Sequence, residues 1–172
     1  MSTALGDLIA LVAADSPAYG SPIHGSAHWR RVAALGLTLA DADRGVDREL
    51  VVLFGILHDS RRVDDGIDID HGPRAAAYLS TLGLDLPPAR RETLTTALAE
   101  HSRGKVSADP TIGACWDADR LDLIRLGRPP RLDLLSTPAA RDPAMHAHAL
   151  ELVTGPPSWS EVLDRLETAR DG

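Results

Sequence analysis

The sequence is poor in cysteine, aromatic residues and lysine. It has one cysteine, Cys115, and aromatic side chains make up 3% of its 172 residues. A single cysteine excludes a disulfide within the chain and is typical of a protein from the reducing cytoplasm. No apolar run approaches the roughly 18 residues of a membrane-spanning helix, and the N-terminal segment lacks the basic start of a signal peptide. We therefore expect a cytoplasmic protein with no membrane partner.

The charged residues argue against another class of partner. The formal net charge is −7, whereas proteins that bind nucleic acid normally present a basic surface. Lys105 is the only lysine. A side chain that binds an anionic ligand is therefore expected to be arginine, which stays charged and can donate two N–H groups to a phosphate.

Signals for β-strands are nearly absent, because β-branched runs with a period of two are missing. Helical periodicity is plentiful, and several helix starts are marked: Asp47, Asp109-Pro110 and Thr137-Pro138 are N-cap signals, and Ser158 with Glu161 forms a capping box. We predict an all-α, compact domain over residues 1–172. The expected helices cover about 3–14, from Ser26 onward, 48–59, 71–82 (ending before Gly83), 88–101, 110–126 (ending at Gly127), 138–152 and 159–170.

A histidine and an aspartate, His58 and Asp59, stand side by side at the end of the apolar segment LVVLFGIL. Polar groups at the end of a buried helix need partners, because burying them unpaired is costly. A divalent cation could satisfy this pair together with further imidazoles and carboxylates elsewhere in the chain. The candidates are His28, His71, His101 and Asp119. Such ligands suit Zn, Fe, Mn, Co or Ni, and Mg is a further candidate for the divalent ion.

The ordered set His28, His58-Asp59 and Asp119 resembles the HD-domain superfamily of metal-dependent phosphohydrolases. The motifs H-G-x-x-H-x-x-R-V around His28 and D-A-D-R-L-D around Asp119 resemble the first and last motifs of that family, and the resemblance covers about 24–127. It implies an HD-type helical bundle, with the C-terminal helices 138–170 packed on this core and one metal ion held by these residues.

A subset of that family adds two histidines and holds two ions, with the aspartate of the HD pair as a bridge. His71 and His101 stand in the corresponding places by order and approximate spacing, and Gly72 with the small residues after it resembles the helix that follows the first of those two histidines. The resemblance therefore favours one or two divalent ions, and with two ions a water activated for attack on a phosphate ester. Consistently, the sequence has no G-x-S-x-G nucleophile motif and no Gly-rich phosphate loop.

The predicted catalytic residues are Asp59, Arg61 and Arg62. The predicted substrate-binding residues are the same two arginines and His24. Either arginine could clamp a phosphate, although some HD enzymes carry a lysine at the place of Arg62, and both could equally be a solvated pair at a helix end. His24 precedes His28 by four residues and could support it or contact substrate, or lie in a loop.

Other polar residues in the sequence are expected to have supporting roles or to lie away from the metal site. Asp122 is expected to orient a ligand histidine, and Asp117 to point elsewhere. Arg31 could face the site, but we favour a pair with a buried carboxylate. His146 and His148 are expected at the surface.

The resemblance implies hydrolysis of a small phosphate ester or nucleotide, so the expected partner is a small phosphorylated molecule. Two alternatives remain open: an HD-fold di-iron oxygenase acting on a small substrate, and a non-catalytic metal-binding HD domain.

Overall fold

The structure, a computed structural model, describes residues 2–168 and is helical, with no strand among these residues. The all-α prediction is therefore confirmed. Three short 3-10 helices, Asp122–Leu126, Leu132–Leu134 and Ala139–Arg141, join the α-helices in the second half of the chain. The α-helices are α1 (Ser2–Asp15), α2 (Ser26–Ala42), α3 (Arg48–Leu57), α4 (His71–Leu79), α5 (Pro88–Glu100), α6 (Pro110–Leu121), α7 (Pro143–Thr154) and α8 (Trp159–Thr168).

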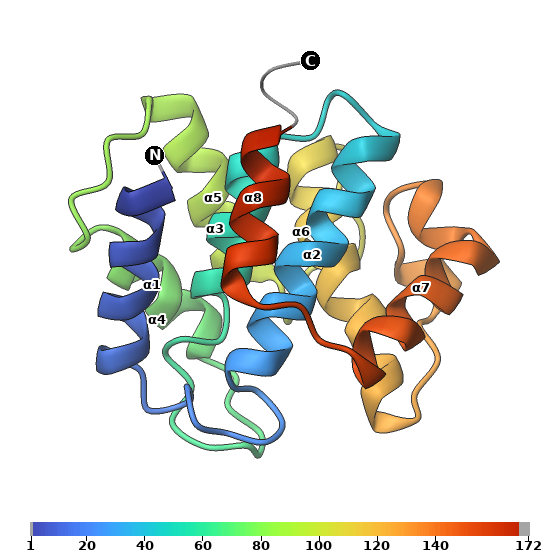
Figure 1. Cartoon of the computed structure of the whole chain (residues 1–172), viewed down its shortest axis with the longest axis horizontal. Helices are drawn as coiled ribbons and strands as arrows, with labels where there is room; N and C mark the ends of the chain where they lie inside the picture. Colours follow the sequence, from blue (N-terminus) through green and yellow to red (C-terminus); the bar gives the residue numbers. More distant parts are fainter. Residues whose placement is uncertain (1, 169–172) are drawn as a thin grey trace.

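Helix α3 lies in the middle of the molecule (Figure 1), and α1, α2, α5, α6 and α8 all contact it. Every residue from Leu50 to Leu57 is buried. This explains the continuous apolar run in the sequence, because a helix covered on all sides has no polar face. The buried apolar side chains form one cluster that extends from α1 to α8.

Two glycines let α2 and α3 pack closely. A Cβ atom on Gly36 would lie 2.8 Å from Cβ of Val51, and one on Gly55 would lie 2.7 Å from Cβ of Ala33. The close approach brings the N-terminal part of α2 beside the C-terminal end of α3, where the predicted metal ligands lie.

Most of the predicted helix signals are confirmed. The Asp47 carboxylate accepts from the backbone N–H groups of Glu49 and Leu50, both at 3.1 Å. Asp109 caps α6 in the same way. Ser158 and Glu161 exchange hydrogen bonds at the start of α8. Gly127, with φ of 69°, ends the 3-10 turn that follows α6.

The predicted helix 138–152 is wrong at its start. Helix α7 begins at Pro143, and Asp142 accepts from the N–H of Ala144 at 2.8 Å. A helix starting at Pro138 would have Pro143 in its interior, where proline breaks the hydrogen-bond pattern. Thr137 instead bonds to Asp117 and precedes the 3-10 helix Ala139–Arg141.

Other boundaries differ by a few residues. Helix α4 ends at Leu79 rather than 82, α3 ends at Leu57, and α6 changes from α to 3-10 geometry at Asp122. Residues 169–170 of the predicted last helix lie outside the described residues. Within residues 2–168, no helix is both long enough and apolar enough to cross a membrane.

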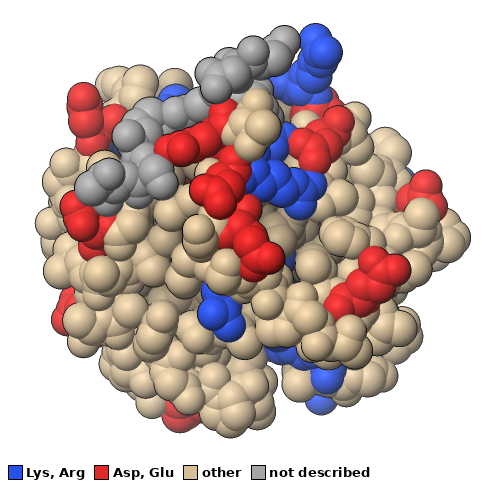
Figure 2. All heavy atoms as spheres, in the orientation of Figure 1, with Lys and Arg blue, Asp and Glu red and all other residues tan. Residues whose placement is uncertain are grey.

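The segments 16–25 and 58–70 run side by side at one end of the bundle, at the bottom of Figure 1. Asp65 joins them, because its carboxylate accepts from the Ser21 hydroxyl and contacts Nδ1 of His24 at 2.9 Å. On the face shown in Figure 2, acidic and basic side chains are interspersed.

Candidate metal centre

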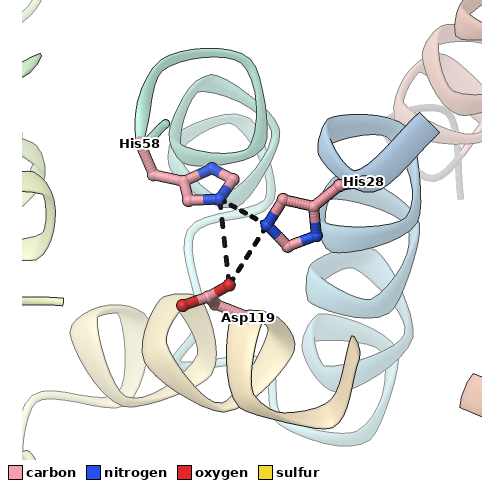
Figure 3. A group of neighbouring side chains, drawn as sticks. All are labelled: His28, His58 and Asp119. Carbon is pink, nitrogen blue, oxygen red and sulfur yellow. Dashed lines mark hydrogen bonds and ion pairs between the residues drawn. The ribbon is translucent and has the colours of Figure 1, made fainter. Parts of the chain in front are cut away.

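The first group of ligand atoms comes from three helices. His28 lies in the first turn of α2, His58 directly follows α3, and Asp119 lies on α6 (Figure 3). The Nε2 atoms of His28 and His58 are 3.0 Å apart, and Oδ1 of Asp119 lies 3.3 Å from the first and 3.8 Å from the second. The three atoms thus face one common point.

The second group consists of His71, His101 and Asp59. His71 is the first residue of α4, and His101 directly follows α5. Their Nε2 atoms are 2.8 Å apart, and Oδ1 of Asp59 lies 3.3 Å from His71 and 3.8 Å from His101. Gly72 permits this approach of α4 to the end of α5, because a Cβ atom there would lie 2.7 Å from the carbonyl oxygen of Leu98.

Asp59 belongs to both groups. While its Oδ1 faces the second group, its Oδ2 lies 3.5 Å from Nε2 of His28 and 3.7 Å from Nε2 of His58. The carboxylate is nearly buried, at 4% side-chain exposure. It can therefore contribute one oxygen to each of two neighbouring cations.

The spacing of these atoms fits metal coordination. Atoms that each lie about 2.0–2.2 Å from one metal ion are about 3 Å from one another, and the contacts within the two groups are 2.8–3.8 Å. Both groups combine imidazole nitrogen with carboxylate oxygen and contain no thiolate, a set that suits zinc, iron, manganese, cobalt and nickel.

In three of the candidate ligand histidines, the contact made by Nδ1 determines whether Nε2 has a lone pair for a metal ion. A backbone carbonyl only accepts, so a neutral histidine beside one carries its proton on Nδ1 and has a lone pair on Nε2. The Nδ1 contacts are His58 with Phe54 at 3.2 Å, His71 with Asp68, and His101 with Leu98 at 2.8 Å. In neutral His71 and His101, two lone pairs would thus face each other at 2.8 Å, a repulsion that a cation between them would remove.

His28 has a different outer partner. Its Nδ1 lies 2.6 Å from Oδ2 of Asp122, and the Asp122 carboxylate also accepts from Arg31 and pairs with Arg125. The contacts expected of Asp122 with a candidate ligand histidine and of Arg31 with a buried carboxylate are therefore present. The carboxylate fixes the orientation of the His28 ring and makes it a stronger ligand.

The electrostatics of the cluster keep its carboxylates ionised. Burial opposes protonation of His28, but hydrogen bonds to Asp119, Asp122 and Asp59 raise its pKa to about 10. Burial lowers the pKa of His58 to about 3. The pKa values of Asp59 and Asp119 are lowered despite burial, because the neighbouring histidines stabilise their ionised forms. Both carboxylates are thus available as anionic ligands at neutral pH.

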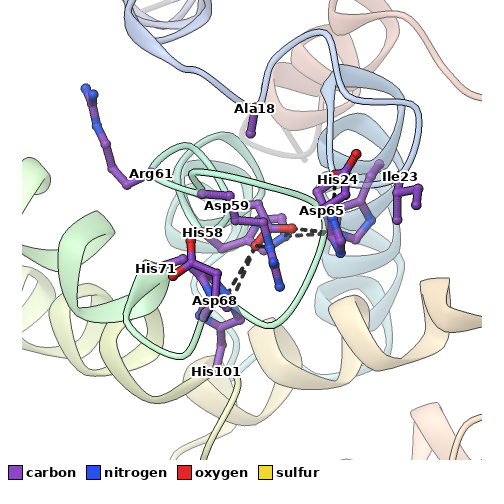
Figure 4. Close-up of polar contacts among 12 residues, drawn as sticks. Ala18, Ile23, His24, His58, Asp59, Arg61, Asp65, Asp68, His71 and His101 are labelled. Atoms are coloured by element: carbon purple, nitrogen blue, oxygen red, sulfur yellow. Dashed lines mark hydrogen bonds and ion pairs between the residues drawn. The ribbon is translucent and has the colours of Figure 1, made fainter.

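The two predicted arginines differ sharply in position. Nε of Arg62 lies 3.0 Å from Oδ1 of Asp59, and its Nη1 donates to the carbonyl of Gly66 at 3.2 Å. Arg61 extends away from the cluster (Figure 4), where it pairs with Asp15 and its guanidinium lies 3.3 Å over the ring of Tyr78. The position of Arg61 does not support the prediction that it binds substrate, because Asp15 at the end of α1 holds it elsewhere.

The candidate ligands other than His58 line a pocket of about 100 Å³. His24 lies at this pocket, in the segment before α2, and its ring centre is 6.3 Å from that of His28. Sequence reasoning missed Arg125, whose spacing of three residues from Asp122 gave no signal of its own. The lining residues are His24, His28, Asp59, Arg62, His71, His101, Ser102, Asp119, Leu123 and Arg125.

Three further polar residues considered in the sequence do not line the pocket: Asp117, His146 and His148. Asp117 is buried and accepts from the backbone of Ser136 and Thr137, so it points elsewhere as predicted. His146 and His148 lie on α7 and are half-buried rather than fully at the surface. His146 contacts the carbonyl of Ala140 at 2.8 Å.

No family model and no curated protein matches the chain. Among solved structures, it is similar to a predicted HD superfamily hydrolase from an uncultured Thermotogales bacterium, with a TM-score of 0.63 over 98% of this chain and 93% of the other. The two sequences are 24% identical. The chain has the HD-domain fold.

Within this HD-domain fold, the two adjacent residues of the motif have different positions in the centre. His58 contributes to the first group, whereas Asp59 contributes to both. The HD-domain fold of this chain thus carries two groups of largely buried side chains that can hold metal ions.

Proposed function

We propose that this protein is a metal-dependent phosphohydrolase that cleaves a small phosphate ester or nucleotide. The observation that carries the proposal is the pair of ligand groups that share Asp59, with Arg62 beside them on the wall of one pocket. His28, His58, Asp119 and Asp59 would hold one ion, and His71, His101 and Asp59 the other. Two such ions supply positive charge for the phosphoryl oxygens and lower the pKa of water.

The side chains of the protein prepare this site in advance. The contacts of the Nδ1 atoms fix the four ligand imidazoles, so little reorganisation is needed when substrate binds. The Arg62 guanidinium lies next to the shared carboxylate, where its positive charge would balance the negative charge of an incoming phosphate. The pocket of about 100 Å³ suits a phosphoryl group, and the net charge of −7 disfavours a polynucleotide.

The test combines metal analysis with activity. Protein purified without chelator should contain a divalent metal, and a panel of phosphate esters with each metal found should reveal hydrolysis. Asp59→Ala should lose metal from both groups and abolish turnover, since both depend on its carboxylate. Arg62→Ala should lower kcat/KM by roughly 10²-fold, the loss expected for one electrostatic contact in a closed site.

Arg61→Ala is the matched control, because Arg61 is adjacent in sequence but pairs with Asp15 outside the pocket. It should retain the activity of the unaltered protein. Bound iron with oxygen uptake and no phosphate release would identify an oxygenase instead. Bound metal with neither activity would identify a non-catalytic metal-binding domain.

A further inference from the structure

A second pocket adjoins the one that contains the ligands. It measures about 220 Å³ and lies between the segment after α3 and the end of α5. Arg62, His71 and Ser102 line both pockets. A phosphate held at the metal ligands would therefore have this space next to it. The other lining residues are Gly66, Ile67, Asp68, Ile69 and Arg103.

The second pocket has apolar walls that the fold itself does not use. Ile67 is 96% exposed and Ile69 is 63% exposed. Their backbone is nevertheless held in place, because Arg62 donates to the carbonyl of Gly66 and Arg103 donates to that of Ile69. Large apolar side chains displayed on an anchored segment beside a polar site are typical of a ligand-contacting surface.

The charged residues also favour the second pocket as the place for the rest of an anionic substrate. Arg62 and Arg103 both line the second pocket, whereas the carboxylates that they pair with, Asp59 and Asp70, do not. Its one lining carboxylate, Asp68, is 6% exposed and paired with Arg74. A different pocket, of about 190 Å³, lies on another side of Arg62. Its lining includes the two carboxylates Asp64 and Asp65, which would repel a phosphate ester.

The size of the second pocket limits what it can hold. A cavity of about 150 Å³ accommodates benzene, so about 220 Å³ is sufficient for a single aromatic or heterocyclic ring. We propose that this pocket binds the alcohol part of the substrate and selects phosphomonoesters of ring-containing alcohols over small hydrophilic ones. The inference rests on the proposed function for the position of the phosphate.

A binding experiment tests this selection without turnover. Phenylphosphonate and methylphosphonate, which have no ester bond to hydrolyse, would be titrated calorimetrically into the metal-loaded protein. Because a ring removes apolar surface from water, phenylphosphonate should bind about tenfold more tightly. The double variant Ile67→Ser, Ile69→Ser should lose this preference and bind methylphosphonate as before.

The matched control replaces two other exposed aliphatic side chains, in the double variant Leu132→Ser, Leu150→Ser. These leucines are 55% and 52% exposed and line neither pocket, so the preference should remain. Equal binding of the two phosphonates, binding of neither, or a preference that survives the isoleucine replacements would overturn the inference.

Kinetics separate this inference from the proposed function. With phenyl phosphate and glycerol phosphate as substrates, the isoleucine variant should lower kcat/KM for the phenyl ester about tenfold and leave the glycerol ester unchanged. If neither ester is hydrolysed but the phosphonate preference depends on Ile67 and Ile69, the ring-binding pocket stands and the hydrolase assignment fails. If both esters are hydrolysed equally by all variants, the hydrolase assignment stands and the ring-binding pocket fails.

Discussion

His28 has an outer partner unlike those of the other three ligand histidines. Carbonyl oxygens face the Nδ1 atoms of His58, His71 and His101, whereas a carboxylate, Asp122, faces that of His28. Asp122 is fully buried and shares its charge with Arg31 and Arg125. The carboxylate thus connects one candidate metal ligand to two arginines behind it, and its negative charge strengthens the imidazole as a donor.

Replacing Asp122 by Asn should weaken metal binding by about 10- to 100-fold, the usual effect of losing such an outer partner. The amide keeps the shape of the side chain but removes the charge that supports His28. Titration calorimetry with the native metal measures the change. Asp117→Asn is the control, because Asp117 is also a buried carboxylate of this region but bonds to Ser136 and Thr137. Equal weakening in both variants would show that general loss of stability, rather than the His28 contact, is responsible.

Single residues show how far the sequence could predict the site. The candidate ligands could be named because their order and local motifs resemble a known pattern, and the structure brings all six together. Arg61 and Arg62 could not be distinguished, since adjacent residues of a helix end point in different directions and the choice depends on a distant partner. That partner is Asp15, at the end of α1, and no pattern in the sequence links it to Arg61.

Among the helices, the packing of α2 on α3 sets the distance between His28 and His58. Gly55 faces the backbone of Ala33 so closely that a Cβ atom would lie 2.9 Å from its Cα. Backbone atoms cannot move aside as a flexible side chain can. An added methyl group here would separate the helices and, with them, the first group of ligands.

We therefore expect Gly55→Ala to lower the free energy of unfolding by about 1–3 kcal/mol, the cost of overpacking a core, and to weaken metal binding as well. Urea denaturation measures the first effect. Gly6→Ala is the control: Gly6 lies within α1, and a Cβ atom added there would meet no packing neighbour within 4 Å among the described residues. The free energy of unfolding of this control variant should rise by up to about 1 kcal/mol, because alanine has a higher helix propensity than glycine. A loss in both variants would contradict the packing explanation.

Helix α8 is attached to α2 and α3 through an ion-pair network. Arg165 and Arg48 both contact the Asp41 carboxylate. Burial acts to raise the pKa of Asp41, but its hydrogen bonds to these arginines lower the pKa below the ordinary value of 3.8. A lowered pKa in the folded state means stability that is present above 3.8 and is lost as the pH falls through the folded value.

Asp41→Asn should accordingly destabilise the protein at neutral pH, by at most about 1 kcal/mol because the pair is half exposed. The difference from the unaltered protein should shrink as the pH is lowered below 3.8. Urea denaturation at a series of pH values down to the acid transition measures both quantities. A difference that stays constant with pH would mean that the charge of Asp41 contributes nothing.

The elements themselves were predictable where one signal was unopposed. Asp47 and Asp109 start helices as expected, because each precedes an apolar segment without a competing cap nearby. Thr137-Pro138 and Asp142-Pro143 compete for one helix, and the second prevails since Pro143 cannot lie inside the helix. The length of α4 was overestimated, because Ser80 and Thr81 fit a helix locally but form a turn before Gly83.

Across the molecule as a whole, the ligands connect most of the bundle. They come from α2, α4 and α6 and from the residues that directly follow α3 and α5. These elements are far apart in the sequence, so their convergence could be expected from the resemblance but not from helical periodicity. Cations held at this place would add links between these helices.

Metal binding should therefore raise thermal stability. A ligand at about 100 times its Kd adds about 2.7 kcal/mol to the folded state, and each kcal/mol shifts Tm by about 2–4 °C for a chain of this size. We expect a rise in Tm of about 5–10 °C between chelator-treated and metal-loaded protein, measured by calorimetry. In Asp59→Ala the rise should nearly vanish, since both groups lose a shared oxygen. In His71→Ala part of it should remain, because the first group keeps all its ligands. An equal rise in all three proteins would place the stabilising ion outside this cluster.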